Sequence, residues 1–88
     1  MDRELFTEKL SHEGFQEVVT VSREPNGFLA THAHPFEAKA LILSGELCLV
    51  TGGAERVYQR GQVFHLLADE AHSERYGADG VEYLVGRK

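Results

Sequence analysis

Three of the five histidines in the chain, His32, His34 and His72, lie at positions where their side chains could do chemistry. His32 and His34 lie two residues apart in the segment FLATHAH, which has the pattern of a strand. Because successive side chains of a strand point to opposite faces, both imidazoles are expected on one face. His72 lies near the start of a second expected strand, and imidazole is a common ligand of transition metals. The alternative for His32 and His34 alone is a pair of surface histidines on an edge strand.

The rest of the sequence predicts the elements that must position these histidines. Residues 2–12 are expected to form a short helix, because Leu5, Phe6 and Leu10 recur at helical spacing. From residue 15 the pattern changes to short apolar runs separated by turns, among them Ser44-Gly45, Gly52-Gly53 and Gly77 to Gly80. Strands are expected at Glu17–Val21, Phe28–His34, Ala38–Leu43, Glu46–Thr51, Glu55–Arg60, Gln62–Leu67, His72–Tyr76 and Val81–Val85. This pattern predicts an all-β antiparallel sandwich or small barrel with a short N-terminal helix.

Length and composition limit the classes of protein to be considered. The 88 residues fit one domain. The net charge of -5 argues against binding nucleic acid by neutralising its phosphates. The single cysteine, Cys48, excludes a disulfide framework and fits a reducing compartment, so a cytoplasmic location is expected. No apolar run approaches the roughly 18 residues of a membrane span, so no membrane partner is expected.

The segment from Gly27 to Tyr76 resembles the cupins, a superfamily of small RmlC-like jelly-roll or double-stranded β-helix barrels. The run THAHPFEAKALILSG supplies His32, His34 and Gly45 of the first cupin motif, and GQVFHLLADEAHSERY supplies Gly61 and His72 of the second. The resemblance implies a cupin jelly-roll barrel of short antiparallel strands as a single domain over residues 1–88. The helix and its lead-in would occupy residues 1–14 and the barrel residues 15–88. It also implies dioxygenase or isomerase chemistry as possible activities and raises the expectation of a homodimer.

The chain departs from the cupin pattern at the fourth ligand. The position of the motif glutamate is Ala38, and the nearest carboxylate, Glu37, comes one residue early. On a regular strand this offset points the side chain to the opposite face, unless a bulge after Pro35 rotates it back. The proline, glycine and asparagine of the second motif are replaced by Leu67, Asp69 and Tyr76.

The resemblance therefore implies a divalent transition-metal site of His32, His34 and His72, with Glu37 as a candidate fourth ligand. Three imidazoles suit Zn, Fe, Ni, Mn or Cu. Without the motif glutamate the site is more positive than the usual cupin site, which favours a small polar or anionic molecule. We expect a small metal-binding cupin that acts on or binds such a molecule. The alternatives are a non-catalytic binding or sensing module with a vestigial metal site and a structural cupin with an inert site.

Alternation along the strand that begins at His72 adds two candidate catalytic residues. If His72 points into the barrel, so do Glu74 and Tyr76. Glu74 is a candidate general base or a partner of a ligating histidine, and Tyr76 is a candidate donor to a bound anion. The alternatives are a glutamate at the barrel rim in water and a tyrosine that only packs. The same reasoning predicts that the barrel is lined by Phe28, Ala30, Ala40, Ile42 and Cys48.

Two further features concern the surroundings of the site. His65 is expected to be a core or outer-face histidine rather than a ligand, and His12 to lie at the helix end. The segment AKALIL is apolar on both faces, which indicates a strand buried on both. Either the N-terminal helix or a second subunit must then cover its outer face, and the homodimer is the partner that the resemblance favours.

Overall fold

The first residues fold into one helix, α1 (Arg3–His12), in a computed structural model that describes all 88 residues. The Asp2 carboxylate caps the start of the helix by accepting a hydrogen bond of 2.7 Å from the backbone N–H of Glu4. The chain leaves the helix through Gly14, whose φ of +88° suits glycine. The helix buries Phe6 and Leu10, and it is too short to cross a membrane.

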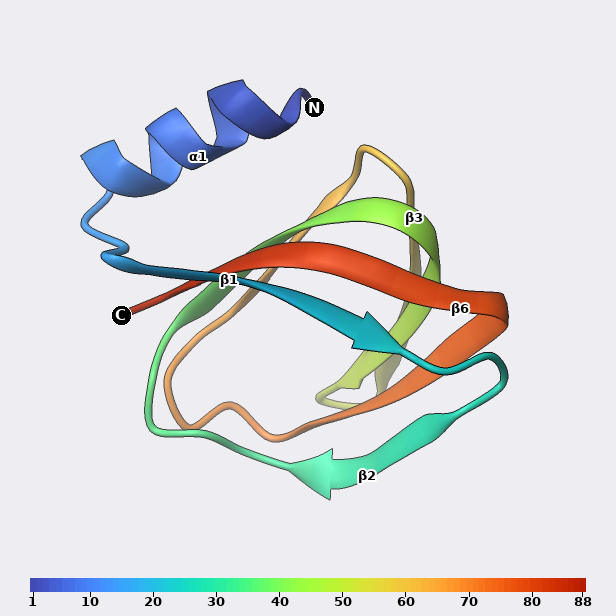
Figure 1. Ribbon diagram of the computed structural model, residues 1–88. Coiled ribbons are helices and arrows are strands. Elements are labelled where there is room, and N and C mark those ends of the chain that lie inside the picture. The colour runs from blue at the N-terminus through green and yellow to red at the C-terminus, as the bar shows by residue number, and fades with distance from the viewer.

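Six antiparallel strands form the rest of the molecule, which confirms the all-β prediction. They are β1 (Glu17–Arg23), β2 (Phe28–His32), β3 (Ala38–Thr51), β4 (Ala54–Gln59), β5 (Val63–Leu66) and β6 (His72–Arg87). The long strands β3 and β6 pair with each other along most of their length. The first half of β3 also pairs with β5, and its second half pairs with β4. The first half of β6 also pairs with β2, and its second half pairs with β1. Each long strand therefore belongs to both faces of a rolled barrel (Figure 1).

The predicted turns at Ser44-Gly45 and at residues 77–80 are wrong, because the structure bends there without ending the strands. The ladder between β3 and β6 shifts register on both sides of Gly45. Gly45 and Gly80 have φ values of +77° and +72°, and a Cβ on Gly45 would collide with the carbonyl oxygen of Gly80. Glycine thus allows two bent strands to cross closely at a corner of the barrel. The hairpin predicted at Gly52-Gly53 is confirmed as the link between β3 and β4.

Apolar side chains pack on both sides of β3, as the AKALIL segment predicted. Its inward residues join a core inside the barrel, made of Ala38, Ala40, Ile42, Leu47, Leu49, Phe64, Leu66, Tyr76, Val81, Tyr83 and Val85. A second cluster lies under the helix and consists of Phe6, Leu10, Phe15, Leu41 and Leu84. The helix, lying across the outside of the barrel in Figure 1, therefore covers the outer face at Leu41 without a second subunit.

Three of the five residues predicted to line the barrel lie elsewhere. Ala40 and Ile42 are buried in the core, but Phe28 is 74% exposed and Ala30 is also exposed. The cause is a bulge in β2: Leu29 pairs with Glu74 and His32 with His72, so three steps on β2 match two on β6. Cys48 is only half-buried and donates a hydrogen bond of 3.0 Å to Glu55 Oε1.

Candidate metal centre

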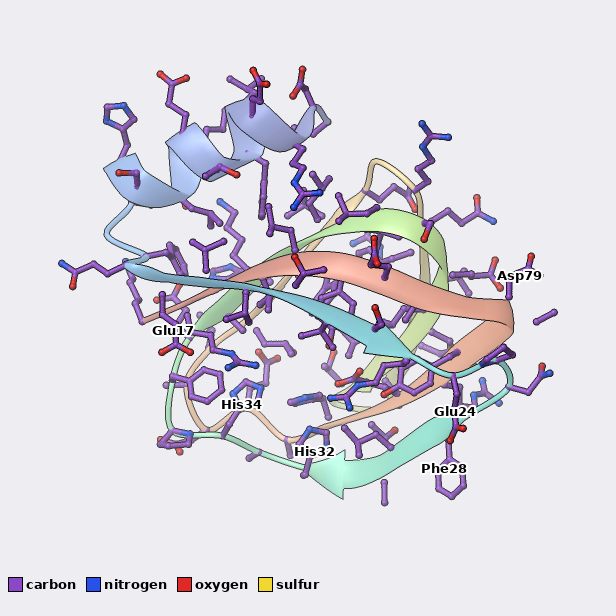
Figure 2. The ribbon with its side chains drawn as sticks, viewed as in Figure 1. Glu17, Glu24, Phe28, His32, His34 and Asp79 are labelled. Atoms are coloured by element: carbon purple, nitrogen blue, oxygen red, sulfur yellow. The ribbon has the colours of Figure 1, made fainter.

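The three candidate histidines gather at the junction of β2 and β6. Because of the bulge in β2, both Leu29 and His32 point to the interior of the barrel, and His32 lies opposite His72 in the ladder. The ring centroids of His32 and His72 are 4.2 Å apart, and those of His34 and His72 are 5.0 Å apart. In Figure 2, Phe28 points away from the barrel, whereas His32 and His34 lie on its inner side. The structure thus places the three rings near one another, but His34 is outside the group of ligand atoms that lie within 4.8 Å of one another.

Each of the three imidazoles is oriented by a backbone carbonyl. The Nδ1 atoms of His32, His34 and His72 lie 2.7, 3.1 and 2.9 Å from the carbonyl oxygens of Ala30, Phe36 and Glu70. Because a carbonyl oxygen only accepts, Nδ1 of each ring carries the proton, and in the neutral ring the lone pair lies on Nε2. This is the arrangement by which proteins prepare histidine for metal binding through Nε2.

The Nε2 atom of His72 is buried without a hydrogen-bond partner, and no other buried side-chain nitrogen or oxygen shares this state. The nearest carboxylate oxygen is Oε2 of Glu74, at 3.5 Å. A buried polar atom without a partner costs about 1–3 kcal/mol. A metal ion at this position would give Nε2 the partner that it lacks, so the site fits the ion that the motifs imply.

Glu74 lies inside the barrel, as alternation from His72 predicted. It is 6% exposed, which excludes the alternative of a glutamate in water at the rim. Its Oε1 atom accepts a hydrogen bond of 3.2 Å from the Tyr76 hydroxyl. One ligand atom each from His32, His72 and Glu74 lie within 4.8 Å of one another, close enough to hold one ion.

Glu37 is not part of this group. Glu37 and Lys88 extend the pairing of β3 with β6 through two backbone hydrogen bonds of 2.8 and 3.0 Å. The regular alternation places Ala38 inside and the Glu37 carboxylate outside, where it pairs with His65. No bulge rotates Glu37 toward the histidines. The structure therefore places a carboxylate next to them from β6, not from the start of β3.

A cavity of about 80 Å³ opens beside the histidines. It is lined by Arg23, Leu29, His32, His34, Phe36, Ala38, Phe64, Leu66, Glu74, Tyr83, Val85 and Arg87. The sequence analysis missed the two arginines and Tyr83. Alternation was a usable signal for them, since Tyr83 and Arg87 share the inward face of β6 with Val85, and Arg23 continues the inward face of β1 from Val21.

The phenols near Glu74 remain protonated well into the alkaline range. Burial raises the pKa of Tyr83, and the negative charge of Glu74 raises it further, while Arg23 opposes the shift. Burial likewise raises the pKa of Tyr76, again assisted by Glu74. Both hydroxyls are therefore hydrogen-bond donors at neutral pH.

Solved structures share this architecture. A protein of unknown function from Rhizobium leguminosarum matches with a TM-score of 0.75 and 17% identity, over 80% of this chain and 66% of its own. An RmlC-like cupin from Shewanella frigidimarina matches with a TM-score of 0.69 and 17% identity, over 80% of this chain and 63% of its own. A DMSP lyase from Ruegeria pomeroyi matches with a TM-score of 0.74 and 22% identity, over 81% of this chain and 36% of its own. The chain thus spans less than two thirds of each of these proteins, and at such identities the likeness shows the fold alone.

Comparison of the sequence with family models and with curated proteins gave no match. The common fold is therefore established by the path of the chain, and the site must be interpreted from its own residues.

Proposed function

Because the chain has the cupin fold, we propose that it is a small metal-binding cupin that binds one divalent transition metal ion through His32, His72 and Glu74. His34, whose ring lies next to that of His72, is the fourth candidate ligand. The observation that carries this proposal is the buried Nε2 of His72, which lacks a partner and lies beside Glu74. Two imidazoles and a carboxylate suit Zn, Fe, Ni, Mn or Cu.

When bound, the ion supplies a Lewis acid with positions left for a small molecule. The residues of the chain prepare this site. Backbone carbonyls fix the imidazole rings, and the Tyr76 hydroxyl holds one oxygen of Glu74. Leu29, Phe64 and Leu66 add apolar side chains to the lining of the cavity. The site therefore suits the binding of a small polar or anionic molecule next to the ion.

Catalysis on that molecule is our first candidate for the use of the site, of dioxygenase or isomerase type. The protonated hydroxyl of Tyr83, which lines the cavity, supports it, because it can donate to a negative charge that develops there. The DMSP lyase with this fold is an enzyme, which agrees with such a use. A non-catalytic binding or sensing module is the second candidate. Glu74 is the one carboxylate that lines the cavity, it accepts a hydrogen bond from Tyr76, and the proposed site uses it as a metal ligand, so no free carboxylate is left as a base.

Two expectations about the setting also remain proposals. A homodimer is supported only by the resemblance to the cupins, because the helix and not a second subunit covers the outer face at Leu41. A cytoplasmic location is supported by the free thiol of Cys48.

The test is metal reconstitution of tag-free protein. The protein is stripped with a chelator, loaded separately with Zn, Mn, Ni, Cu and, without oxygen, Fe, and then passed through a desalting column. We expect about one ion per chain for at least one metal by elemental analysis, and X-ray absorption should show both nitrogen and oxygen ligands. Folded protein that retains no ion of any of these metals would refute the proposal.

A further inference from the structure

We propose that the cavity beside the histidines selects a short-chain carboxylate and that Arg23 binds its carboxylate group. The inference rests on the proposed function, since it names the class of molecule that would lie next to the metal ion. It starts from the charges around the cavity. Two arginines, Arg23 and Arg87, face one carboxylate, Glu74, in a chain whose net charge is -5. With a divalent metal ion bound, the cavity would be a locally positive site in an acidic protein, which favours an anionic ligand.

The two arginines differ in what already binds them. Arg87 Nη1 lies 3.2 Å from Glu17 Oε1, and its guanidinium lies 5.3 Å from the centre of the Phe36 ring. Arg23 has no carboxylate within 4.0 Å, although the chain contains 14 acidic residues. A guanidinium can hold a carboxylate through two parallel hydrogen bonds. Arg23 is therefore the cation that is free to bind a ligand.

The position of Arg23 suits capture at the mouth of the cavity. It is the last residue of β1, it is exposed, and it lines both the histidine cavity and the neighbouring hollow between β1 and β2. Arg23 also lowers the pKa of Tyr83, which lines the cavity, against the effect of burial. Arg23 thus reaches from solvent toward the residues that line the cavity.

The size and the walls of the cavity define the rest of the ligand. Its volume of about 80 Å³ lies well below the roughly 300–1,000 Å³ of sites for drug-sized molecules. Leu29, Phe36, Phe64 and Leu66 offer apolar contacts to a carbon chain. A carboxylate with a few carbon atoms fits these limits.

The test is a titration of metal-loaded, ¹⁵N-labelled protein with butyrate and with its uncharged analogue butyramide, at constant ionic strength. We expect butyrate to shift the amide signals of residues around the cavity and butyramide to bind at least about tenfold more weakly. Arg23→Gln should weaken butyrate binding at least about tenfold, and Arg23→Lys should recover part of the loss. Arg60→Gln is the matched control, because it removes the same charge from a residue outside the cavity. The spectra also report whether each variant is folded.

Four outcomes separate this inference from the metal site. Selective loss of butyrate binding in Arg23→Gln supports it. Equal affinity of the wild type and folded Arg23→Gln overturns it while leaving the metal site intact. If no metal is retained but metal-free protein still binds butyrate through Arg23, the inference stands and the proposed metal function fails. Absence of butyrate binding in both the metal-loaded and the metal-free protein overturns it.

Discussion

His72 and Glu74 lie two residues apart on β6 and place Nε2 and Oε2 3.5 Å from each other inside the barrel. Strand alternation puts both side chains on one face, and the pairing of β6 with β2 brings His32 against them. This chain has Ala38 where the first cupin motif has a glutamate, and Glu74 on β6 places a carboxylate beside the histidines instead. This arrangement gives the first two predictions.

His72→Ala should lower metal affinity at least about 100-fold, because it removes a proposed ligand that the backbone carbonyl of Glu70 orients. Isothermal titration with Zn²⁺ of chelator-stripped protein measures the change. His65→Ala is the control, since His65 pairs with Glu37 on the outer side and should leave the affinity unchanged. Equal losses in the two variants would show that His72 is not the third ligand.

Glu74→Gln should lower the affinity for Zn²⁺ at least about tenfold, because an amide oxygen carries no charge to offset that of the ion. Glu37→Gln should have no measurable effect, since that carboxylate lies outside the cavity. Competition with a chromophoric chelator compares the two variants directly. A larger loss for Glu37→Gln would restore the ligand position suggested by the sequence alone.

Tyr83 should make stability fall at alkaline pH. Its pKa is raised above the ordinary value of 10.0, so the folded state holds its proton more tightly than the unfolded state does. This contribution is fully present below about pH 10 and is lost as the pH rises through the folded-state pKa. Urea unfolding of metal-free protein between pH 9 and about 11.5 should show a shallower decline for Tyr83→Phe than for the wild type. Tyr58→Phe, outside the cavity, should keep the wild-type slope, and three identical slopes would contradict the argument.

Gly45→Ala should destabilise the barrel more than Gly52→Ala. Both positions have positive φ, which costs an alanine about 1–2 kcal/mol. A Cβ at Gly45 would also collide with the backbone of Gly80, whereas one at Gly52 meets no atom within 4 Å. We therefore expect a loss of about 3 kcal/mol or more for Gly45→Ala, measured by urea unfolding. Equal losses would mean that the two bent strands can separate without cost.

Leu10→Ala should cost about 2–5 kcal/mol, because Leu10 is fully buried between the helix and the outer face of the sheet. Leu5→Ala, at a position that is 47% exposed on the same helix, should change stability by less than about 1 kcal/mol. Thermal unfolding at several protein concentrations measures both. A small effect of Leu10→Ala would indicate that the helix does not cover Leu41 in solution.

Local spacing was enough to predict much of this molecule. Through their resemblance to the two cupin motifs, His32, His34, His72 and the motif glycines predicted the barrel and a group of three neighbouring imidazoles. Alternation along one regular strand also placed Glu74 inside correctly, because the direction of a side chain there depends only on its own strand. The two apolar faces of AKALIL correctly required a cover, and the helix provides it.

Tertiary structure decided where alternation stops and which strands meet. The bulge in β2 sends Phe28 outward and keeps His32 inside, and it exists only because two strands far apart in sequence pair out of step. Gly45 and Gly80 have the positive φ of turn residues, yet the chain continues as strand because a neighbour pairs on both sides of the bend. The cavity with Arg23, Arg87 and Tyr83 likewise forms only in the folded barrel, where residues of β1 and β6 lie next to those of β2. Local periodicity is a property of one strand, whereas register and enclosure belong to pairs of strands.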